Sequence, residues 1–450
     1  MNEALAELFE GARVPRYTSY PTVPHFSAAI GTSEHGAWLA ELPVEKAISV
    51  YLHVPYCQEL CWYCGCNTHV AGSQARVLAY GQLLERELDL QLDLLPGRAT
   101  VSHLHWGGGT PSILGPERFS GLMARLRERL NFRQDAELAI ELDPRTFDRS
   151  MASALAEAGI NRVSLGVQSF ERAVQQAIHR DQSFEVTAAS VELLRGHGID
   201  RINADLLYGL PLQTVANCEA TVRQLLELEP ARIAIFGYAH LPRLLKHQRL
   251  IDEAQLPSTK ERLTQFEAMA RLLVAAGYQA IGLDHFAKPD DSMAVAAREG
   301  RLRRNFQGYT TDPAEALLGF GASAISSLPT GYLQNHSDLK AYREDVRAGR
   351  LPTAKGIRLT ARDRVERSII EAVMCNGDVD LAAIAAAHAV PLGECLPRGR
   401  RLQELERHGV VHRAGTRWTV DEECWPLLRV VAAAFDSYLD GAAGRHAAAI

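Results

Sequence analysis

The stretch YLHVPYCQELCWYCGCNTHV, residues 51–70, holds four of the chain's eight cysteines, at positions 57, 61, 64 and 66. The other four stand singly in apolar surroundings, where packing is the usual role of a free cysteine. Disulfide bonds require an oxidising compartment, and the acidic N-terminus MNEALAELFEGARVPR lacks the basic and apolar regions of a signal peptide. In a cytoplasmic protein, thiols this close together indicate metal or redox chemistry.

The spacing of the cysteines separates two kinds of metal site. A structural zinc site uses two separated pairs of ligands, whereas no second CxxC follows this loop. Three thiols at C-x3-C-x2-C suit an iron–sulfur cluster, which prefers soft thiolate ligands. The pattern resembles the cluster motif of the radical S-adenosylmethionine (SAM) enzymes. That resemblance implies that Cys57, Cys61 and Cys64 hold a [4Fe-4S] cluster whose fourth iron binds SAM.

Segments typical of strands recur on both sides of this loop and alternate with segments whose apolar residues have helical spacing. The strand segments are 47–57, 101–110, 136–144, 162–170, 202–211 and 231–240. Such alternation predicts βα units and a parallel sheet. With six units we expect an α/β fold, a partial (β/α)6-type barrel of the radical SAM kind rather than an open doubly wound sheet.

Polar residues follow the apolar part of each of these strands. They are Cys57, Gly108, Gly109, Thr110, Glu141, Asp143, Gln168, Asp205, Tyr238 and His240. In barrel enzymes the carboxyl ends of the strands carry the catalytic groups. One such residue alone is usually a cap or a turn residue, but six consecutive strand ends predict a shared site.

The pattern divides the chain into five regions. We expect an N-terminal extension closing over the active site (1–45), the barrel (46–290), a linker and substrate-side segment (291–355), a mainly helical C-terminal domain (356–440) and a disordered tail (441–450). In the C-terminal domain, a helix before Gly409 and two strands around a turn at Gly415 resemble a winged helix. Because Glu404 and Glu406 lie among the arginines of that helix, we expect a packing or lid domain that does not bind nucleic acid.

Composition limits the class of protein further. The 450 residues are 47% hydrophobic and 23% charged, as in ordinary globular proteins. No apolar run approaches the roughly 18 residues that cross a bilayer. The formal net charge of -6 argues against a general basic surface for nucleic acid, so an anionic ligand would need a local group of cations.

Segments beyond the cluster motif resemble one family, the oxygen-independent coproporphyrinogen III oxidases of haem biosynthesis. They are VPRYTSYPT (14–22), CQELCWYCGC (57–66), HWGGGTPS (105–112), NRVSLGVQSF (161–170), DLLYGLP (205–211), DHFAKPDD (284–291) and RNFQGYTT (304–311). The fourth cysteine, the RYTSYPT segment and the NFQGYTT segment distinguish this family from its closest relatives. The match covers nearly the whole chain.

The resemblance implies two SAM molecules, one on the cluster and one beside it. Positions that match the family's SAM contacts are Tyr51, Tyr63, Gly108, Gly109, Thr110, Glu141, Gln168, Arg180, Asp205, Ala239 and Ile325. Carboxylates such as Glu141 suit ribose hydroxyls or an amino group, and Arg180 suits a carboxylate. Cys66 is not needed for a three-thiolate site, and both a role near the substrate and a structural role remain open.

The family chemistry is radical decarboxylation. A 5′-deoxyadenosyl radical removes hydrogen from a propionate β-carbon of coproporphyrinogen III, and loss of CO2 and an electron leaves a vinyl group. Two rounds give protoporphyrinogen IX. We expect a cytoplasmic, monomeric enzyme served by an electron donor such as flavodoxin or ferredoxin and by an electron acceptor that the sequence does not identify.

The substrate's four carboxylates call for arginines, whose planar guanidinium groups match a carboxylate. The candidates are Arg16, Arg301, Arg303 and Arg304, although a charge run of this kind also suits a solvated face. Three rival readings stay open: a haem-binding or haem-trafficking relative, a haem-degrading relative, and a binding protein with a zinc knuckle.

Overall fold

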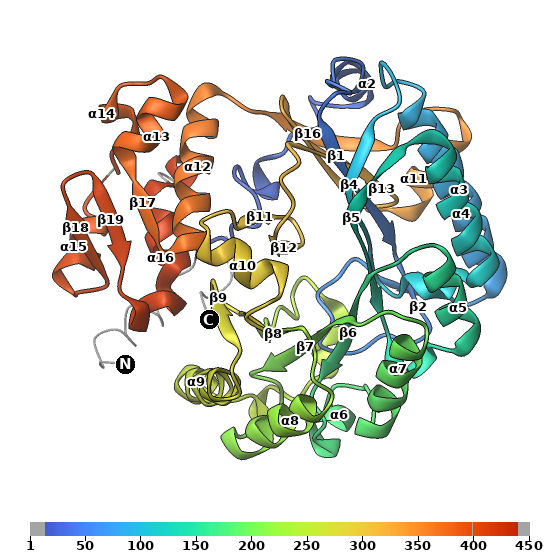
Figure 1. Ribbon diagram of the computed structural model, residues 1–450, viewed down its shortest axis with the longest axis horizontal. Helices are drawn as coiled ribbons and strands as arrows, with labels where there is room; N and C mark the ends of the chain where they lie inside the picture. Colours follow the sequence, from blue (N-terminus) through green and yellow to red (C-terminus); the bar gives the residue numbers. More distant parts are fainter. Residues whose placement is uncertain (1–13, 398, 440–450) are drawn as a thin grey trace.

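The computed structural model describes residues 14–397 and 399–439. Its central feature is one curved sheet of 12 strands in the order β16-β15-β14-β13-β1-β4-β5-β6-β7-β8-β10-β9. The strands from β13 through β8 in that order run parallel. Helices cover the outer face of the curve (Figure 1). The end strands β16 and β9 do not pair with each other, so the barrel is partial, as the sequence predicts.

The six predicted strands are all present. They are β1 (Ala47–Val54), β4 (Thr100–Gly108), β5 (Asn131–Leu142), β6 (Arg162–Gln168), β7 (Arg201–Tyr208) and β8 (Arg232–Gly237). Apolar side chains on their outer face pack under the helices, where Leu104, Trp106 and Phe119 are almost completely buried. Burial on both faces explains why these strands read as apolar runs.

Helices return the chain to the start of each next strand. They are α3 (Gln74–Leu92), α4 (Pro116–Arg129), α5 (Arg149–Glu157), α6 (Arg172–Ala177), α7 (Phe184–Gly196), α8 (Val215–Glu227) and α9 (Thr259–Ala275). Local sequence fixes several starts: Asp148 caps α5 through the Met151 amide, and Ser258 with Glu261 forms a capping box on α9. No helix in the described ranges is long and apolar enough to cross a membrane.

Much of the segment expected as a linker belongs to the sheet. Its strands and helices are α10 (Ser292–Arg298), β11 (Arg303–Asn305), β12 (Gly308–Thr310), β13 (Ala316–Phe320), β14 (Ile325–Leu328), β15 (Gly331–Asn335), α11 (Leu339–Arg347) and β16 (Thr353–Arg358). β13 lies parallel to β1 as a seventh parallel strand, and β14 to β16 continue the sheet antiparallel. These strands lack intervening long helices, which is why the alternating pattern did not reveal them. At the opposite end, β10 (His285–Ala287) and β9 (Gln279–Ile281) form the other edge of the sheet.

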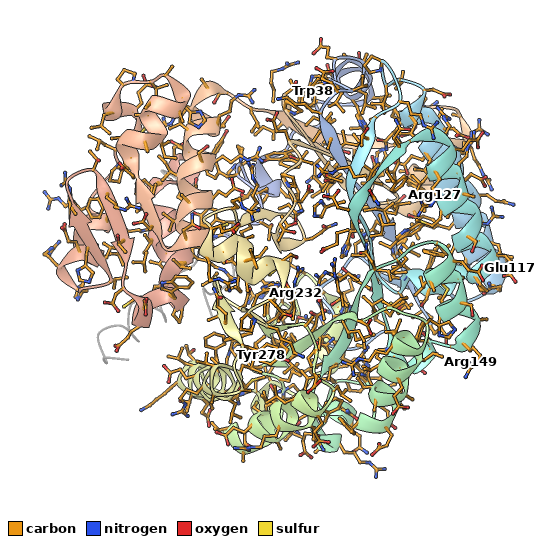
Figure 2. The ribbon with its side chains drawn as sticks, viewed as in Figure 1. Trp38, Glu117, Arg127, Arg149, Arg232 and Tyr278 are labelled. Atoms are coloured by element: carbon orange, nitrogen blue, oxygen red, sulfur yellow. The ribbon has the colours of Figure 1, made fainter. Side chains whose placement is uncertain are left out.

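Paired charges fill the inside of the curve near the start of the strands. Arg162 Nε lies 2.9 Å from a Glu137 carboxylate oxygen, and Arg232 Nε lies 2.6 Å from Asp291. Asp291 also contacts Arg162 at 3.1 Å, so two cations meet two anions. Figure 2 shows Arg232 within the curve, whereas Glu117 and Arg149 lie on the outer helices. Burial raises the pKa of Glu137, but the two arginines outweigh it and hold that pKa at about 2.

The C-terminal domain packs its own core beside the barrel. It contains α12 (Ala361–Asn376), β17 (Asp378–Asp380), α13 (Leu381–His388), α14 (Leu392–Cys395), α15 (Arg401–Arg407), β18 (Val411–Ala414), β19 (Arg417–Val420) and α16 (Leu428–Ala432). β18 and β19 form the expected hairpin, and β17 adds a third strand.

The N-terminal extension passes between the barrel and the C-terminal domain as a strap, residues 14–22. The helix α2 (Thr32–Ala40) follows the strap. Val14, Tyr17 and Tyr20 are buried in the core of the C-terminal domain. The Tyr17 hydroxyl donates to Asp436 at 2.9 Å, and Tyr332 of the barrel sheet donates to the Tyr20 carbonyl at 3.2 Å. The strap therefore joins the barrel to the C-terminal domain. The predicted tail, 441–450, and residues 1–13 lie outside the described residues.

A buried carboxylate ties the added strands to the barrel. Glu87 of α3 accepts hydrogen bonds from the Tyr342 hydroxyl at 2.6 Å, the Gly321 amide at 2.7 Å and the Asn335 side chain at 2.6 Å. Gln91 donates a fourth at 2.9 Å. Glu87 thus fixes the turn that follows β13 and precedes Ile325.

We predict that Glu87→Gln lowers stability, because the new amide turns N–H groups toward two of these four donors. Each buried donor left without an acceptor costs about 1–3 kcal/mol. Thermal unfolding should show a clear fall in Tm, while the matched change Glu85→Gln, on the exposed face of α3 in an ion pair with Arg118, should change it little. Equal Tm values for the two variants would contradict this role of Glu87.

Candidate functional site

The cysteine loop follows β1 and leaves the sheet at its carboxyl edge. β2 (Tyr56–Cys57) and β3 (His69–Val70) pair at its base. Between them, the Trp62 amide donates to the Ile178 carbonyl at 2.9 Å, and the Cys64 amide donates to the Cys61 carbonyl at 3.1 Å. Neighbouring segments therefore hold a loop that has almost no regular structure of its own.

Two arginines lie against the sulfur of Cys61. Arg180 Nη1 is 3.5 Å and Arg145 Nη2 is 3.7 Å from Cys61 Sγ. Both guanidinium groups also bond the Asp143 carboxylate, at 3.3 Å and 2.7 Å. Burial raises the pKa of Asp143, but Arg145 and Arg180 outweigh it and lower that pKa below the ordinary value. The positive charge of both guanidinium groups therefore lies against the Cys61 sulfur.

The other thiols sit in different surroundings. Burial raises the pKa of Cys57 to about 11, although the Thr110 hydroxyl donates to its sulfur at 3.4 Å. A hydrogen bond from the Cys66 thiol lowers the pKa of Cys64 to about 6. Cys66 is exposed beside Cys64, and the charge of Glu141 acts on it from the barrel edge.

The thiols of the loop suit a [4Fe-4S] cluster by their chemistry. Within residues 14–397 and 399–439, no three His, Cys, Asp or Glu side chains converge closely enough to hold one metal ion. Iron–sulfur clusters are held by soft thiolates. The loop offers three such thiols, and Arg180, whose Nε is buried without a partner, supplies nearby positive charge for an anionic group.

A run of glycines presses against the base of the loop. The Gly109 amide donates to the Val54 carbonyl at 2.8 Å, and the Thr110 amide donates to the Tyr56 carbonyl at 2.8 Å. A Cβ on Gly109 would lie 2.5 Å from the Tyr56 carbonyl oxygen, and one on Gly108 would lie 2.7 Å from the His53 ring. We predict that these glycines contact SAM. Their lack of a side chain also makes room for the Tyr56 carbonyl and the His53 ring.

Two carboxylates face the inside of the barrel at this edge. Glu141 Oε1 lies 3.0 Å from His105 Nε2, and Glu141 Oε2 accepts from the Gly108 amide at 3.2 Å. Asp205 accepts from the Ser164 hydroxyl at 3.1 Å. Burial, followed by the negative charge of Glu141, raises the pKa of Asp205 to about 6. Together with the His285 ring, both carboxylates line one cavity.

The remaining SAM positions gather at the same edge. Tyr51 lies on β1 with its hydroxyl 2.9 Å from His53 Nδ1, and Gln168 ends β6 with a positive φ of 68°. The Tyr63 and Ala239 carbonyls both accept from the Gln248 side chain, at 3.0 Å and 3.2 Å. Ile325 begins β14, beside the end of β13. Strands and loops thus bring the predicted set together, while the SAM contacts themselves stay a prediction.

The four predicted substrate arginines separate into two groups. Arg301 is exposed and paired with Glu299, and Arg303 lies on the exposed side of the β11 hairpin, as expected of a solvated face. Arg304 instead turns inward, with Nε bonded to the Tyr17 carbonyl at 3.1 Å and its guanidinium 4.5 Å from the Tyr309 ring centre. Its Nη2 lies 3.4 Å from the Arg16 carbonyl, so Arg304 joins the strap to the barrel.

Two further arginines lie near Arg304 and Arg16, and the sequence patterns did not single them out. Arg262 of α9 lies over the Tyr208 ring at 5.8 Å, and Arg429 of α16 lies 3.9 Å from Asp284. We call Arg16, Arg262, Arg304 and Arg429 the arginine cluster. Burial lowers the pKa of both Arg262 and Arg429, and the positive charge of Arg16 lowers each further.

Two carboxylates lie beside the arginine cluster. Burial raises the pKa of Asp284, but His285, Arg304 and Arg429 outweigh it and hold that pKa at about 2, and Glu371 accepts from the Arg304 amide at 3.1 Å. Arg262 Nε and Arg304 Nη1 are buried without hydrogen-bond partners. Buried N–H groups without partners indicate a place for a ligand that accepts hydrogen bonds. A sequence signal existed for Arg262: Gly209 and Gly237, at two strand ends, leave room for its guanidinium.

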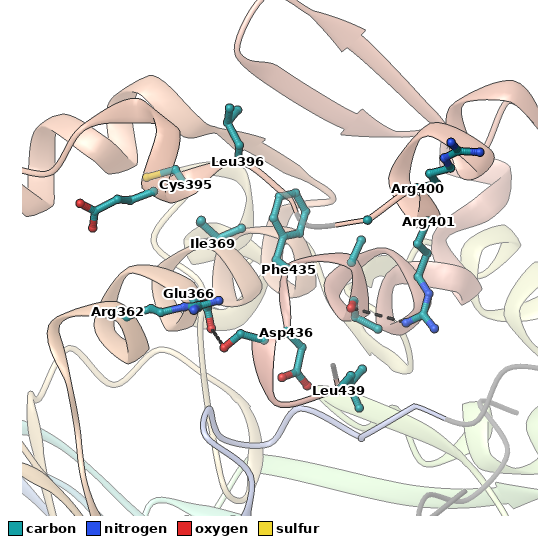
Figure 3. A pocket seen from close by; sticks show the side chains of 15 residues that line it. Arg362, Glu366, Ile369, Cys395, Leu396, Arg400, Arg401, Phe435, Asp436 and Leu439 are labelled. Carbon is teal, nitrogen blue, oxygen red and sulfur yellow. Dashed lines mark hydrogen bonds and ion pairs between the residues drawn. The ribbon is translucent and has the colours of Figure 1, made fainter. Parts of the chain in front are cut away.

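A second cavity lies within the C-terminal domain and has a different character (Figure 3). Its polar groups bond one another: the Ser437 hydroxyl donates to Glu366 at 2.7 Å, and Arg401 donates to the Ala433 carbonyl at 3.5 Å. Asp436 there is the acceptor for Tyr17 of the strap. This cavity therefore belongs to the anchoring of the strap.

Comparison with known proteins agrees with this site. Residues 51–225 match the radical SAM superfamily, and residues 359–427 match the HemN C-terminal domain. The chain is 50% identical over 450 residues to an oxygen-independent coproporphyrinogen III oxidase of Bradyrhizobium diazoefficiens, with 100% of both chains covered. The chain belongs to the oxygen-independent coproporphyrinogen III oxidase family. It is a radical SAM oxidoreductase, whose cofactors are a [4Fe-4S] cluster and SAM.

Other members confirm the family along the whole chain. The Escherichia coli K12 enzyme of the same name is 40% identical over 426 residues, covering 94% of this chain and 93% of the relative. The solved structure described as coproporphyrinogen III oxidase (HemN) from Escherichia coli has a TM-score of 0.89 and 37% identity, covering 95% of this chain and 100% of that one. The predicted family and fold are therefore confirmed.

We predict that Gly109→Ala loosens the cysteine loop, because its Cβ would overlap the Tyr56 carbonyl. Overpacking of this kind costs about 1–3 kcal/mol. Iron and sulfide content after anaerobic reconstitution should fall, together with Tm. Gly121→Ala is the matched control, since Gly121 lies within α4 with open space around it and alanine suits a helix. If Gly109→Ala retained full cluster content and Tm, the contact would have no role in shaping the loop.

Proposed function

We propose that the chain converts coproporphyrinogen III to protoporphyrinogen IX by oxidative decarboxylation of two propionate side chains to vinyl groups. The observation that carries the proposal is the arginine cluster, which lies at the barrel edge that also holds the cysteine loop. A substrate with four carboxylates needs such a group of cations on a chain of formal net charge -6. Membership of the family supports the same reaction.

In this proposal Cys57, Cys61 and Cys64 ligate the cluster. Arg180 and Arg145 stabilise the sulfur of Cys61, and the Thr110 hydroxyl donates to that of Cys57. When bound, the reduced cluster and SAM supply the 5′-deoxyadenosyl radical that removes hydrogen from the propionate β-carbon.

The chain's own polar groups orient SAM. Glu141 and Asp205 supply acceptors for hydroxyl or ammonium groups, and Arg180 supplies a donor for a carboxylate. A cavity lined by Glu141, Asp205 and His285 lies inside the barrel, and these polar groups support a second SAM there, beside the first. We therefore propose two SAM molecules per chain, as the family resemblance implies.

The arginine cluster holds the substrate by its propionates. Arg262 and Arg304 each present a buried N–H group without a partner, and Arg16 adds an exposed cation from the strap. Arg429 contributes from the C-terminal domain. Binding two or more carboxylates in this way holds the macrocycle in one orientation. Less entropy is then lost when the propionate reaches the reacting geometry. The strap and the C-terminal domain thereby close the site over the substrate.

The proposed partners follow from electron balance. Each round needs one electron to reach the cluster and releases one electron from the substrate radical as CO2 leaves. We propose a flavodoxin or ferredoxin as the donor and an external acceptor for the released electron. We further propose a monomeric enzyme working in the cytoplasm, where such donors and the reduced cluster are kept.

An anaerobic assay tests the reaction. The reconstituted protein with SAM, dithionite and coproporphyrinogen III should form 5′-deoxyadenosine and a tetrapyrrole that has lost two CO2, both detected by mass spectrometry. Cys61→Ala should abolish both products. Deoxyadenosine with an opened macrocycle would instead indicate a haem-degrading enzyme, and haem binding without any turnover would indicate a trafficking protein.

The arginine cluster can be tested without turnover. Titration of the protein with coproporphyrin III, the stable oxidised form of the substrate, should show at least tenfold weaker binding for Arg262→Gln and for Arg429→Gln, or about 1.4 kcal/mol each. The coproporphyrin tetramethyl ester, which has no carboxylates, should bind the variants and the native protein alike. Arg271→Gln, an exposed arginine on the same helix as Arg262, is the matched control. Unchanged affinity in both cluster variants would remove these arginines from the substrate site.

A further inference from the structure

The segment LPRLLKHQRL, residues 241–250, lies between β8 and α9, and its exposed side chains have no part in the site described above. It contains the two most exposed large apolar side chains among the described residues: Leu244 is 79% and Leu250 is 59% exposed. Arg243, Lys246 and Arg249 are exposed around them, and the segment holds no acidic residue. We call this surface the 241–250 patch; in Figure 1 it lies in the connection that leads to α9.

The 241–250 patch contacts the main chain of the cysteine loop directly. His247 Nε2 lies 2.7 Å from the Cys64 carbonyl oxygen, and the buried Gln248 side chain donates to the Tyr63 carbonyl at 3.0 Å. A short path of covalent bonds and one hydrogen bond therefore connects an exposed surface with a predicted cluster ligand. The patch is rigidly placed, because Gln248 also donates to the Ala239 carbonyl at 3.2 Å.

We propose that the 241–250 patch is the docking surface for a small acidic electron-carrier protein that reduces the cluster. The inference rests on the proposed function, which requires single electrons from outside. One electron passes from the reduced carrier to the oxidised cluster, so the carrier is oxidised by one electron and the cluster reduced by one. Exposed leucines among cations suit such a partner, since small, transient redox interfaces combine an apolar centre with complementary charge.

Charge complementarity selects an acidic partner. The chain as a whole is acidic, so a negatively charged carrier is repelled by most of the surface and attracted where cations gather. The next acidic residues along the chain are Asp252 and Glu253, and Glu253 is paired with His240 at 3.0 Å. Three cations without an acidic residue among them thus mark one place beside the cysteine loop.

The test compares two reductants on the reconstituted holoenzyme. Dithionite is small and needs no docking surface, whereas reduced flavodoxin, an acidic one-electron carrier, serves as the protein probe. For Leu244→Ser and for the double variant Arg243→Glu with Lys246→Glu, we expect cluster reduction by flavodoxin, followed optically without substrate, to slow at least tenfold. The flavodoxin concentration giving half-maximal 5′-deoxyadenosine formation should rise by a similar factor, while rates with dithionite should stay within twofold.

A matched control lies at the other end of the barrel. α9 ends near the start of β9, which runs parallel to β8, so the last turns of this helix lie away from the cysteine loop. There Arg271 and Val274 combine an exposed cation with a 55% exposed apolar side chain. Arg271→Glu with Val274→Ser should leave both rates unchanged. Raising the salt concentration should slow flavodoxin reduction of the native protein and affect the charge-reversed variant less.

The outcomes distinguish docking from other roles. Equal slowing with both reductants would show that the patch supports the cluster rather than a partner, and unchanged flavodoxin rates would place docking elsewhere; either result overturns the proposal. Direct titration with oxidised flavodoxin gives a second readout, in which the patch variants should bind at least tenfold more weakly. Failure of the proposed decarboxylation would appear separately, as dithionite-driven deoxyadenosine formation without loss of CO2.

Discussion

The cysteine loop takes its shape from neighbours rather than from its own secondary structure. Main-chain carbonyls at Val54, Tyr56 and Cys64 accept hydrogen bonds from two other segments: Gly109 and Thr110 supply the first two donors and His247 supplies the third. Because a cluster needs three sulfurs at fixed separations, every element that supports these carbonyls also sets the metal site. The rest of the barrel can be understood as the frame that brings those segments to one edge.

The parts that local sequence determines were predictable. A parallel strand is a short apolar run, and its first polar residues mark the edge of the sheet, so the amino-acid pattern alone places Glu141 and Asp205 at that edge. Contacts between residues far apart in the sequence produce no comparable pattern in the amino-acid sequence. The bond from Arg180 to Cys61 joins residues 119 apart in the chain, and Arg429 reaches the barrel from a separate domain. Strands β13 to β16 were missed because they follow one another without the helices that make βα units visible.

Arginine and carboxylate side chains form two different arrangements in the barrel. Near the start of the strands, Arg162 and Arg232 face Glu137 and Asp291, so two cations are matched by two anions. At the opposite edge, four arginines share few carboxylates. A protein gains little by burying unbalanced charge for its own stability, and this is why we propose that the four arginines bind the carboxylates of the substrate.

The strap joins the two ends of the chain, since Tyr17 bonds Asp436 across 419 residues. During synthesis, the cysteine loop and the strands around it leave the ribosome long before Asp436 does. Throughout that interval the strap lacks its partner Asp436 in the C-terminal domain. The order of translation therefore means that the strap, and with it Arg16, reaches its final place only after almost the whole barrel has been synthesised.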